Sequence, residues 1–149
     1  MAVLQFPCEN LNDTQQAAEA LAKLLRPGDV IAYRGGMGAG KTTFTRSLCA
    51  ALGIDAWVSS PTFALVNEYP GPEFSLCHFD MYRIGSFDEL YSTGFFDYLD
   101  RGDILAVEWS ENIEGALPPG TITVTFAITG ETARTITVEG VDDREPTGH

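Results

Sequence analysis

One stretch constrains this chain more than any other. Residues 35–42 read Gly-Gly-Met-Gly-Ala-Gly-Lys-Thr and fit the pattern G-x-x-x-x-G-K-[ST]. Glycines allow the backbone to turn several N–H donors toward one anion, and they place no side chain in its way. The unpaired N–H groups that open the next helix face the same anion. The pattern therefore predicts a phosphate-binding loop. The residues expected around the phosphates are Gly35, Met37, Gly38, Ala39, Gly40, Lys41, Thr42 and Thr43.

The sequence on either side of the loop supports this interpretation. Residues 30–33 form a short β-prone run, and residues 41–52 have the pattern of a helix that Gly53 ends. Strand, loop and helix in this order are the context that the pattern requires. We expect Lys41 to reach the outer phosphates of a purine nucleotide and the Thr42 hydroxyl to hold a magnesium ion.

Composition limits the classes of protein that this chain can belong to. A length of 149 residues with 44% hydrophobic residues suits one domain with its own core. Three cysteines without a C-x-x-C pair indicate free thiols in a reducing compartment, and no apolar run reaches the roughly 20 residues that span a membrane. We therefore expect a cytoplasmic protein. Its net charge of −12 disfavours direct binding to nucleic acid and suits a basic protein partner.

The remaining sequence predicts an α/β fold of three layers around a mixed, partly parallel sheet, with an antiparallel hairpin at the sheet edge. The first helix is expected to begin at Asn12 or Asp13, with Gln15 or Gln16 in a capping box. Ser86 predicts a second capping box, and the aromatic residues that follow it are expected in the core. Residues 140–149 are expected to form a disordered tail after one domain at 1–139. The expected strands cover residues 3–6, 30–33, 63–69, 74–80, 103–109, 121–128 and 133–138.

Two acidic residues follow apolar strands and are candidates for the chemistry. A phosphate loop needs a second acidic group that holds magnesium or orients the attacking water. Asp80 and Glu108 both qualify, because ligands of open α/β sheets bind beyond the carboxyl ends of the strands. The sequence alone leaves open which of them does which task. His78, in the same strand as Asp80, is interpreted as a packed or hydrogen-bonded histidine rather than a catalytic one.

Residues 59–63, Ser-Ser-Pro-Thr-Phe, allow two interpretations. Pro61 holds Ser60 in an extended conformation, which is typical of a turn that leads into a strand. Alternatively, Thr62 belongs to a switch loop that reaches the terminal phosphate and its magnesium.

Several blocks occur together in one order and carry a specific resemblance. They are residues 37–44 of the loop, Ser60-Pro61-Thr62-Phe63, His78-Phe79-Asp80-Met81-Tyr82-Arg83, Glu89-Leu90 with Gly94, and Val107-Glu108-Trp109. This set closely resembles the bacterial TsaE family, formerly YjeE, and the likeness covers most of residues 10–138. The phosphate loop alone is generic, whereas the H-F-D-x-Y-R and E-W blocks are specific to the family.

The resemblance implies more than the residues show by themselves. It implies a P-loop fold that binds ATP with magnesium and hydrolyses it weakly. The family acts with the TsaD and TsaB proteins, which install threonylcarbamoyl on adenosine 37 of tRNA. The resemblance therefore implies that the chain contacts tRNA only indirectly, through that complex. Nucleotide hydrolysis resets the complex between turnovers.

Residue roles also follow from the resemblance. It makes Thr42 and Glu108 magnesium ligands, Asp80 the second acidic residue and Thr62 a switch residue. It places Trp109 at the site and the docking surface. Adenine would lie between the N-terminal region, Asn12 to Thr14, and the late hairpin near Arg134.

Other functions remain open at this point. The loop also permits a small-molecule kinase, although no late arginine cluster suggests the lid that such kinases close. A GTPase would carry N-K-x-D and D-x-x-G, and neither occurs in the sequence. A domain that binds nucleotide without hydrolysing it is the third alternative.

Overall fold

Seven strands form one mixed sheet in this computed structural model, which describes residues 3–35, 40–55, 58 and 65–141. The strands are β1 (Val3–Cys8), β2 (Val30–Arg34), β3 (Val66–Pro70), β4 (Ser75–Asp80), β5 (Ile104–Glu108), β6 (Ile122–Ile128) and β7 (Arg134–Glu139). The α-helices are α1 (Leu11–Ala22), α2 (Lys41–Ala51), α3 (Phe87–Ser92) and α4 (Phe95–Asp100), and η1 (Ser110–Ala116) is a 3₁₀-helix.

The sheet has the order β1-β7-β6-β2-β5-β4-β3. Its four central strands, β6, β2, β5 and β4, run parallel, and the outer pairs are antiparallel. All five residues of β5 and the first four of β2 are buried, as expected for strands covered on both faces. The predicted α/β class and the partly parallel sheet are confirmed. The hairpin of β6 and β7 also forms, but β1 pairs with β7 and takes the edge position.

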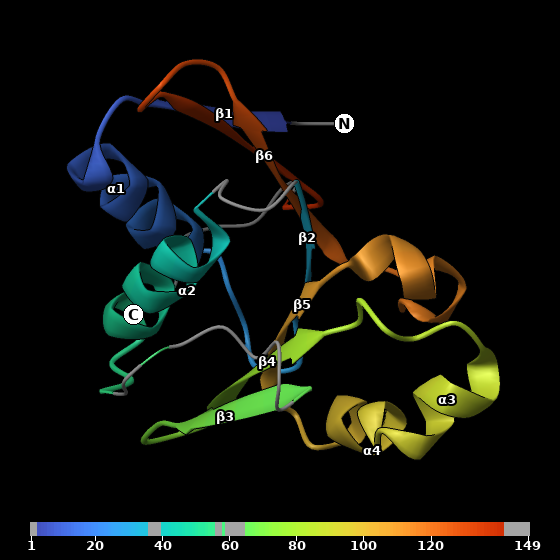
Figure 1. Cartoon of the computed structure of the whole chain (residues 1–149). Coiled ribbons are helices and arrows are strands. Elements are labelled where there is room, and N and C mark those ends of the chain that lie inside the picture. Colours follow the sequence, from blue (N-terminus) through green and yellow to red (C-terminus); the bar gives the residue numbers. More distant parts are fainter. Residues whose placement is uncertain (1–2, 36–39, 56–57, 59–64, 142–149) are drawn as a thin grey trace.

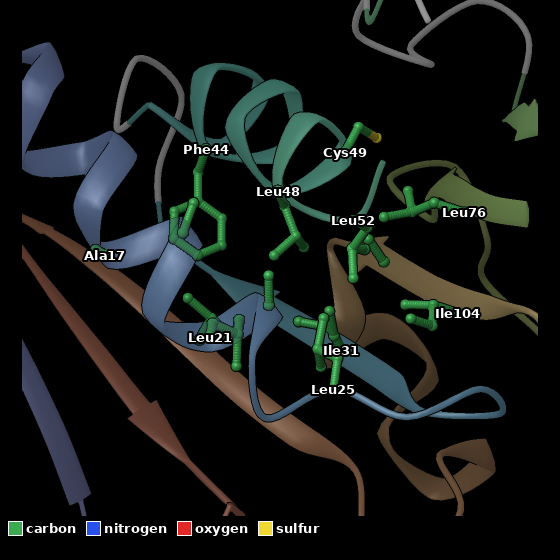
Figure 2. Close-up of a cluster of buried hydrophobic side chains, with 14 of the residues drawn as sticks. Ala17, Leu21, Leu25, Ile31, Phe44, Leu48, Cys49, Leu52, Leu76 and Ile104 are labelled. Carbon is green, nitrogen blue, oxygen red and sulfur yellow. The ribbon is translucent and has the colours of Figure 1, made fainter. Parts of the chain in front are cut away.

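Helices cover both faces of the sheet (Figure 1). The helices α1 and α2 lie on one face, and α3, α4 and η1 lie on the other. The larger core lies under α1 and α2, where Leu21, Leu48 and Ile31 meet (Figure 2). The smaller core, around Phe79 and Phe95, lies under α3 and α4. Strand alternation sends neighbouring side chains of β4 and β5 to different cores.

Two sequence-based predictions need correction at the chain's beginning and end. The N-cap of α1 is Asn10, not Asn12 or Asp13, because Asn10 is the extended residue whose Oδ1 accepts the Asp13 N–H at 2.9 Å. Asp13 completes the cap by accepting the Glu9 N–H, whereas Gln15 bonds to Glu19. At the other end, Val141 is buried in the larger core, so the packed domain extends beyond the predicted limit of 139. Residues 142–149 lie outside the described part.

Two other local predictions hold, whereas Phe87 and Tyr91, expected in the core, are exposed. Ser86 caps α3, and its Oγ accepts the Glu89 N–H at 3.2 Å while Glu89 accepts the Gly85 N–H. The loop helix α2 ends just before Gly53, which has φ of +78°. Among the described residues, no helix is long and apolar enough to cross a membrane.

Candidate nucleotide site

The two predicted carboxylates lie side by side at the carboxyl ends of β4 and β5. In the parallel register of these strands, Asp80 is the partner of Glu108. Alternation places both on the same face as Leu76 and Ile104, which belong to the core under α2. The helix that follows the phosphate loop therefore starts on the same face and at the same end of the sheet as both carboxylates.

The described ends of the loop have the conformation that the glycine pattern predicts. Gly40 has φ of +95°, and Gly35 has φ of +139°. A Cβ added at Gly35 would lie 2.7 Å from the Phe126 carbonyl oxygen, so a side chain has no room there. Residues 36–39, which include the predicted Met37, Gly38 and Ala39, lie outside the described residues, as does Thr62.

Lys41 is buried at the start of α2 and connects the loop to Glu108. Its Nζ donates to the Gly35 carbonyl at 2.9 Å and lies 3.6 Å from Glu108 Oε1. A buried charge is costly unless it is paired, and these contacts meet that requirement. The lysine is therefore held between the loop and the carboxylate, close to where the phosphates are expected.

His78 is the functional candidate that sequence reasoning missed. It is fully buried, and its Nε2 lies 2.6 Å from Glu108 Oε2, while the other carboxylate oxygen faces Lys41. Burial by itself would raise the pKa of Glu108, but the contacts with His78 and Lys41 outweigh it and hold that pKa below its usual value. The spacing His78–Asp80 did contain a signal, since residues two apart on a strand share a face.

Asp80 holds the turn after β4. Its Oδ1 accepts the Tyr82 N–H at 2.9 Å, and the Met81 N–H donates to the Glu108 carbonyl at 3.0 Å. Asn112 Nδ2 then donates to the Met81 and Tyr82 carbonyls at 2.9 and 3.2 Å. The segments that follow the two carboxylates are thus tied together.

Trp109, which the resemblance places at the site, directly follows Glu108 and also packs against the smaller core. Its backbone has φ of +58°, which is uncommon for a bulky residue. Its ring centroid lies 5.8 Å from Lys41 Nζ and 4.9 Å from the Tyr82 ring. The indole therefore flanks the lysine and shields one side of the cluster.

The chemistry of these side chains fits a magnesium ion. Glu108 and Asp80 offer carboxylate oxygens and Thr42, in the first turn of α2, offers a hydroxyl, which are the hard ligands that Mg²⁺ prefers. Nowhere in the described ranges do three His, Cys, Asp or Glu side chains gather in a way that would hold a metal by themselves. Magnesium typically keeps waters and binds through one or two carboxylates plus substrate phosphates, so this sparse set is appropriate.

A cavity of about 390 Å³ opens beside the loop helix. Gly40 and Thr43 line one side, and Thr132 and Arg134 from the hairpin line another. The N-terminal side is formed by Glu9, Asn10, Leu11 and Thr14. Arg134 thus lines this cavity, whereas the predicted Asn12 is exposed on α1 and is not among the described lining residues. Leu11, the first residue of α1, lines the cavity instead, and it is 73% exposed.

Comparison with known proteins agrees with this arrangement. The family model described as threonylcarbamoyl adenosine biosynthesis protein TsaE matches residues 8–136. A Bacillus subtilis protein named tRNA threonylcarbamoyladenosine biosynthesis protein TsaE is 35% identical over 144 residues, or 97% of this chain and 90% of its own length. The Aquifex aeolicus protein of the same name is 45% identical over 105 residues, covering 69% and 74% of the two chains.

A solved structure extends the likeness to the fold. The crystal structure of YdiB from Bacillus subtilis superposes with a TM-score of 0.75 at 32% identity, covering 92% of this chain and 84% of that one. The sequence blocks, the P-loop arrangement and these matches lead to one conclusion: this chain belongs to the TsaE family of threonylcarbamoyl adenosine biosynthesis proteins.

Proposed function

We propose that this protein binds ATP with magnesium and hydrolyses it, and that the nucleotide cycle acts as a switch on the TsaD–TsaB complex, which modifies adenosine 37 of tRNA. One observation carries the proposal. Lys41, at the junction of phosphate loop and helix, faces the buried carboxylate of Glu108 at the carboxyl end of β5. A lysine and a carboxylate in these positions are what a P-loop ATPase requires.

Binding would change the partners of Lys41. The lysine shares its charge between the Gly35 carbonyl and Glu108 Oε1. The phosphates of ATP offer a stronger partner for the ammonium group, so binding would draw Lys41 away from Glu108. Glu108 Oε1 then becomes available as a ligand, while His78 keeps the other oxygen in place. The adenine ring would enter the cavity beside α1 and rest on the exposed side chain of Leu11.

The roles of the polar side chains follow from this placement. Thr42 and Glu108 would hold the magnesium ion, which neutralises charge on the phosphates when it is bound. Asp80 accepts the Tyr82 N–H through Oδ1, so we assign Oδ2 to the attacking water. The water oxygen bonds to the γ-phosphorus, the bond to the bridging oxygen breaks, and ADP leaves. The water proton passes to Asp80 or to solvent.

The surface charge supports action through a protein complex. A net charge of −12 repels tRNA phosphates, so contact with tRNA would be indirect, through TsaD and TsaB. These proteins work where tRNA is modified, which makes the cytoplasm the proposed location.

The test is ATP turnover by the purified full chain, alone and with TsaD and TsaB from the same organism. We expect slow turnover alone and a clear rise with the complex, and GTP should compete poorly. The Lys41→Ala variant supplies the baseline. Equal turnover in both conditions would contradict the switch. Faster phosphoryl transfer to a metabolite than to water would instead support the small-molecule kinase.

A further inference from the structure

A groove lies on the α3 and α4 side of the molecule, away from the nucleotide cavity. It encloses about 650 Å³, within the size range of ligand sites. One wall carries Phe87, Leu90 and Phe96, and the other carries Asn112, Ile113 and Ala116 of η1. These residues belong to α3 and α4 on one side and to η1, the orange helix that follows β5 in Figure 1, on the other.

The aromatic residues at this groove are more exposed than the sequence predicts. Phe95 is buried as expected, but Phe87 and Tyr91 are 66% and 68% exposed. Their rings contact each other and Phe96, with centroids 5.7 to 6.5 Å apart. Contiguous exposed rings beside a hollow are typical of a surface that another molecule covers.

The charge around the groove limits what can bind there. Residues 82–117 hold half of the chain's net charge, since they contain eight acidic and two basic residues. Arg101, one of the two, is bonded to Glu68 and Asp103. The exposed acidic residues of this segment lie on the helices that form the walls and are called the acidic rim here: Asp88, Glu89, Asp97, Asp100, Glu111 and Glu114, of which Glu114 is paired with Arg34. Such a rim repels RNA, a second copy of this acidic face, and the chain's own acidic residues 142–149.

The groove is connected to the nucleotide site through its walls. The turn that Asp80 holds leads into α3, and Glu108 and Trp109 lead directly into η1. Asn112 lines the groove and donates to the Met81 and Tyr82 carbonyls. A molecule that contacts Asn112 would therefore affect the hydrogen bonds that connect the segment after Asp80 with the segment after Glu108.

We propose that this groove binds an amphipathic helix of a protein partner, with aliphatic side chains on one face and lysines or arginines beside them. The apolar walls accept the aliphatic face and the acidic rim pairs with the basic side chains, which is a known mode of helix recognition. This inference deepens the proposed function and rests on it only for the identity of the partner, TsaD–TsaB.

The first experiment tests the groove independently of the partner. The isotope-labelled full chain is titrated with a synthetic helix of leucine and lysine, and separately with the same helix carrying glutamate for lysine. We expect only the lysine helix to bind, with amide shifts concentrated in α3, α4 and η1. The double variant Phe87→Ser, Tyr91→Ser should weaken it at least tenfold, whereas Ile128→Ser, at a position on the hairpin that is 55% exposed, should not. Shifts elsewhere, or equal binding by the double variant, would overturn the proposal.

A charge reversal sharpens this test. Glu111→Lys, beside Asn112, leaves the apolar walls intact and should weaken the lysine helix while improving binding of the glutamate helix. An unchanged preference would contradict the role of the rim.

The second experiment uses the proposed partner. TsaD–TsaB should stimulate ATP turnover of the parent and of Ile128→Ser, but not of the double variant, whose own nucleotide binding stays normal. If TsaD–TsaB still stimulates the double variant, the groove is not the binding site for the partner, and the proposed function is unaffected. Absence of stimulation even in the parent contradicts the partnership, and the peptide titration then decides the groove alone.

Discussion

Two polar clusters lie at opposite ends of β4 and β5 and are built from the same kinds of residue. The carboxyl-end cluster contains Lys41, His78, Glu108 and Trp109. The amino-end cluster contains Glu68, Tyr98, Arg101 and Asp103. In each cluster a cation lies near an aromatic ring and pairs with at least one carboxylate: Lys41 Nζ lies 5.8 Å from the Trp109 ring, and Arg101 Cζ lies 4.6 Å from the Tyr98 ring.

Burial and chain context separate the two clusters. The side chains of Lys41 and Glu108 are 7% and 10% exposed, whereas those of Arg101 and Glu68 are 42% and 41% exposed. An exposed ion pair contributes about 0.2–1 kcal/mol, but a buried charge that loses its partner is strongly destabilised. A glycine loop also precedes Lys41, and nothing like it adjoins Arg101. The comparison teaches that residue type alone does not distinguish a candidate active site from a surface ion pair.

The largest expected difference between the two clusters is in ATP turnover after the cation of each cluster is removed. Lys41→Ala should lower ATP turnover by about 10²–10³-fold, the range observed when one preorganised donor to a transition state is lost. Arg101→Ala, the matched control, should leave turnover unchanged. Steady-state phosphate release measures both. Similar losses in the two variants would mean that the clusters do not differ in function.

Substitution of His78 should have the next largest effect on the nucleotide site. The effect should be smaller than for Lys41 because His78 contacts Glu108 and not the nucleotide itself. His78→Leu should lower magnesium-dependent nucleotide affinity by about 10–100-fold, as expected for loss of a group that orients a metal ligand. Binding without magnesium should change little. His78→Gln, which keeps a donor, should recover part of the loss.

Isothermal titration with and without magnesium makes the distinction. A leucine variant that binds magnesium and nucleotide like the parent would show that His78 only packs. Equal loss with and without magnesium would point to a general packing defect instead.

The amino-end cluster should affect stability more than activity, and only slightly. Arg101→Ala removes the contacts with Glu68 and Asp103 and the stacking on Tyr98. We expect the free energy of unfolding to fall only slightly, since the side chains are substantially exposed and solvent screens their charges. Urea denaturation at low and high salt measures this loss, which should shrink as salt screens the charges. A loss of several kcal/mol would show that this cluster is a major source of stability.

The smallest effect concerns Cys77, whose Sγ lies 3.8 Å from Asp103 Oδ2. Burial raises the pKa of this thiol to about 12, and the nearby Asp103 and Glu68 carboxylates add to the shift. Because the folded value is above the ordinary 9.0, the stabilising contribution is complete below pH 9 and is lost as pH rises toward 12. At pH 8 the thiol should react slowly in the native protein and quickly in urea.

Asp103→Asn should speed native labelling of Cys77 modestly, since an amide still accepts the Ser75 N–H but carries no charge. A thiol-reagent time course measures the rate, with Cys49 as the internal reference because burial alone raises its pKa to about 12. Fast labelling of native Cys77 would contradict its burial.

Local features explain which predictions succeeded. The glycine pattern, the Ser86 cap and the alternation in residues 121–138 each specify a structure over a few neighbouring residues, and all three form where they are described. Placing Asp80 and Glu108 together also needed only their positions at strand ends, because parallel strands end at one edge of the sheet.

The tertiary structure alone decided the rest. It put β1 outside the hairpin, left Phe87 and Tyr91 exposed beside a groove, and brought His78 against Glu108. None of these outcomes follows from a short stretch of sequence, because each depends on which residues distant in the chain become neighbours. The sequence determined the phosphate loop and the strands that present two carboxylates. Packing of β4 and of α2 against β5 determined which histidine and which lysine contact Glu108, since a contact exists only once both sides of it have folded.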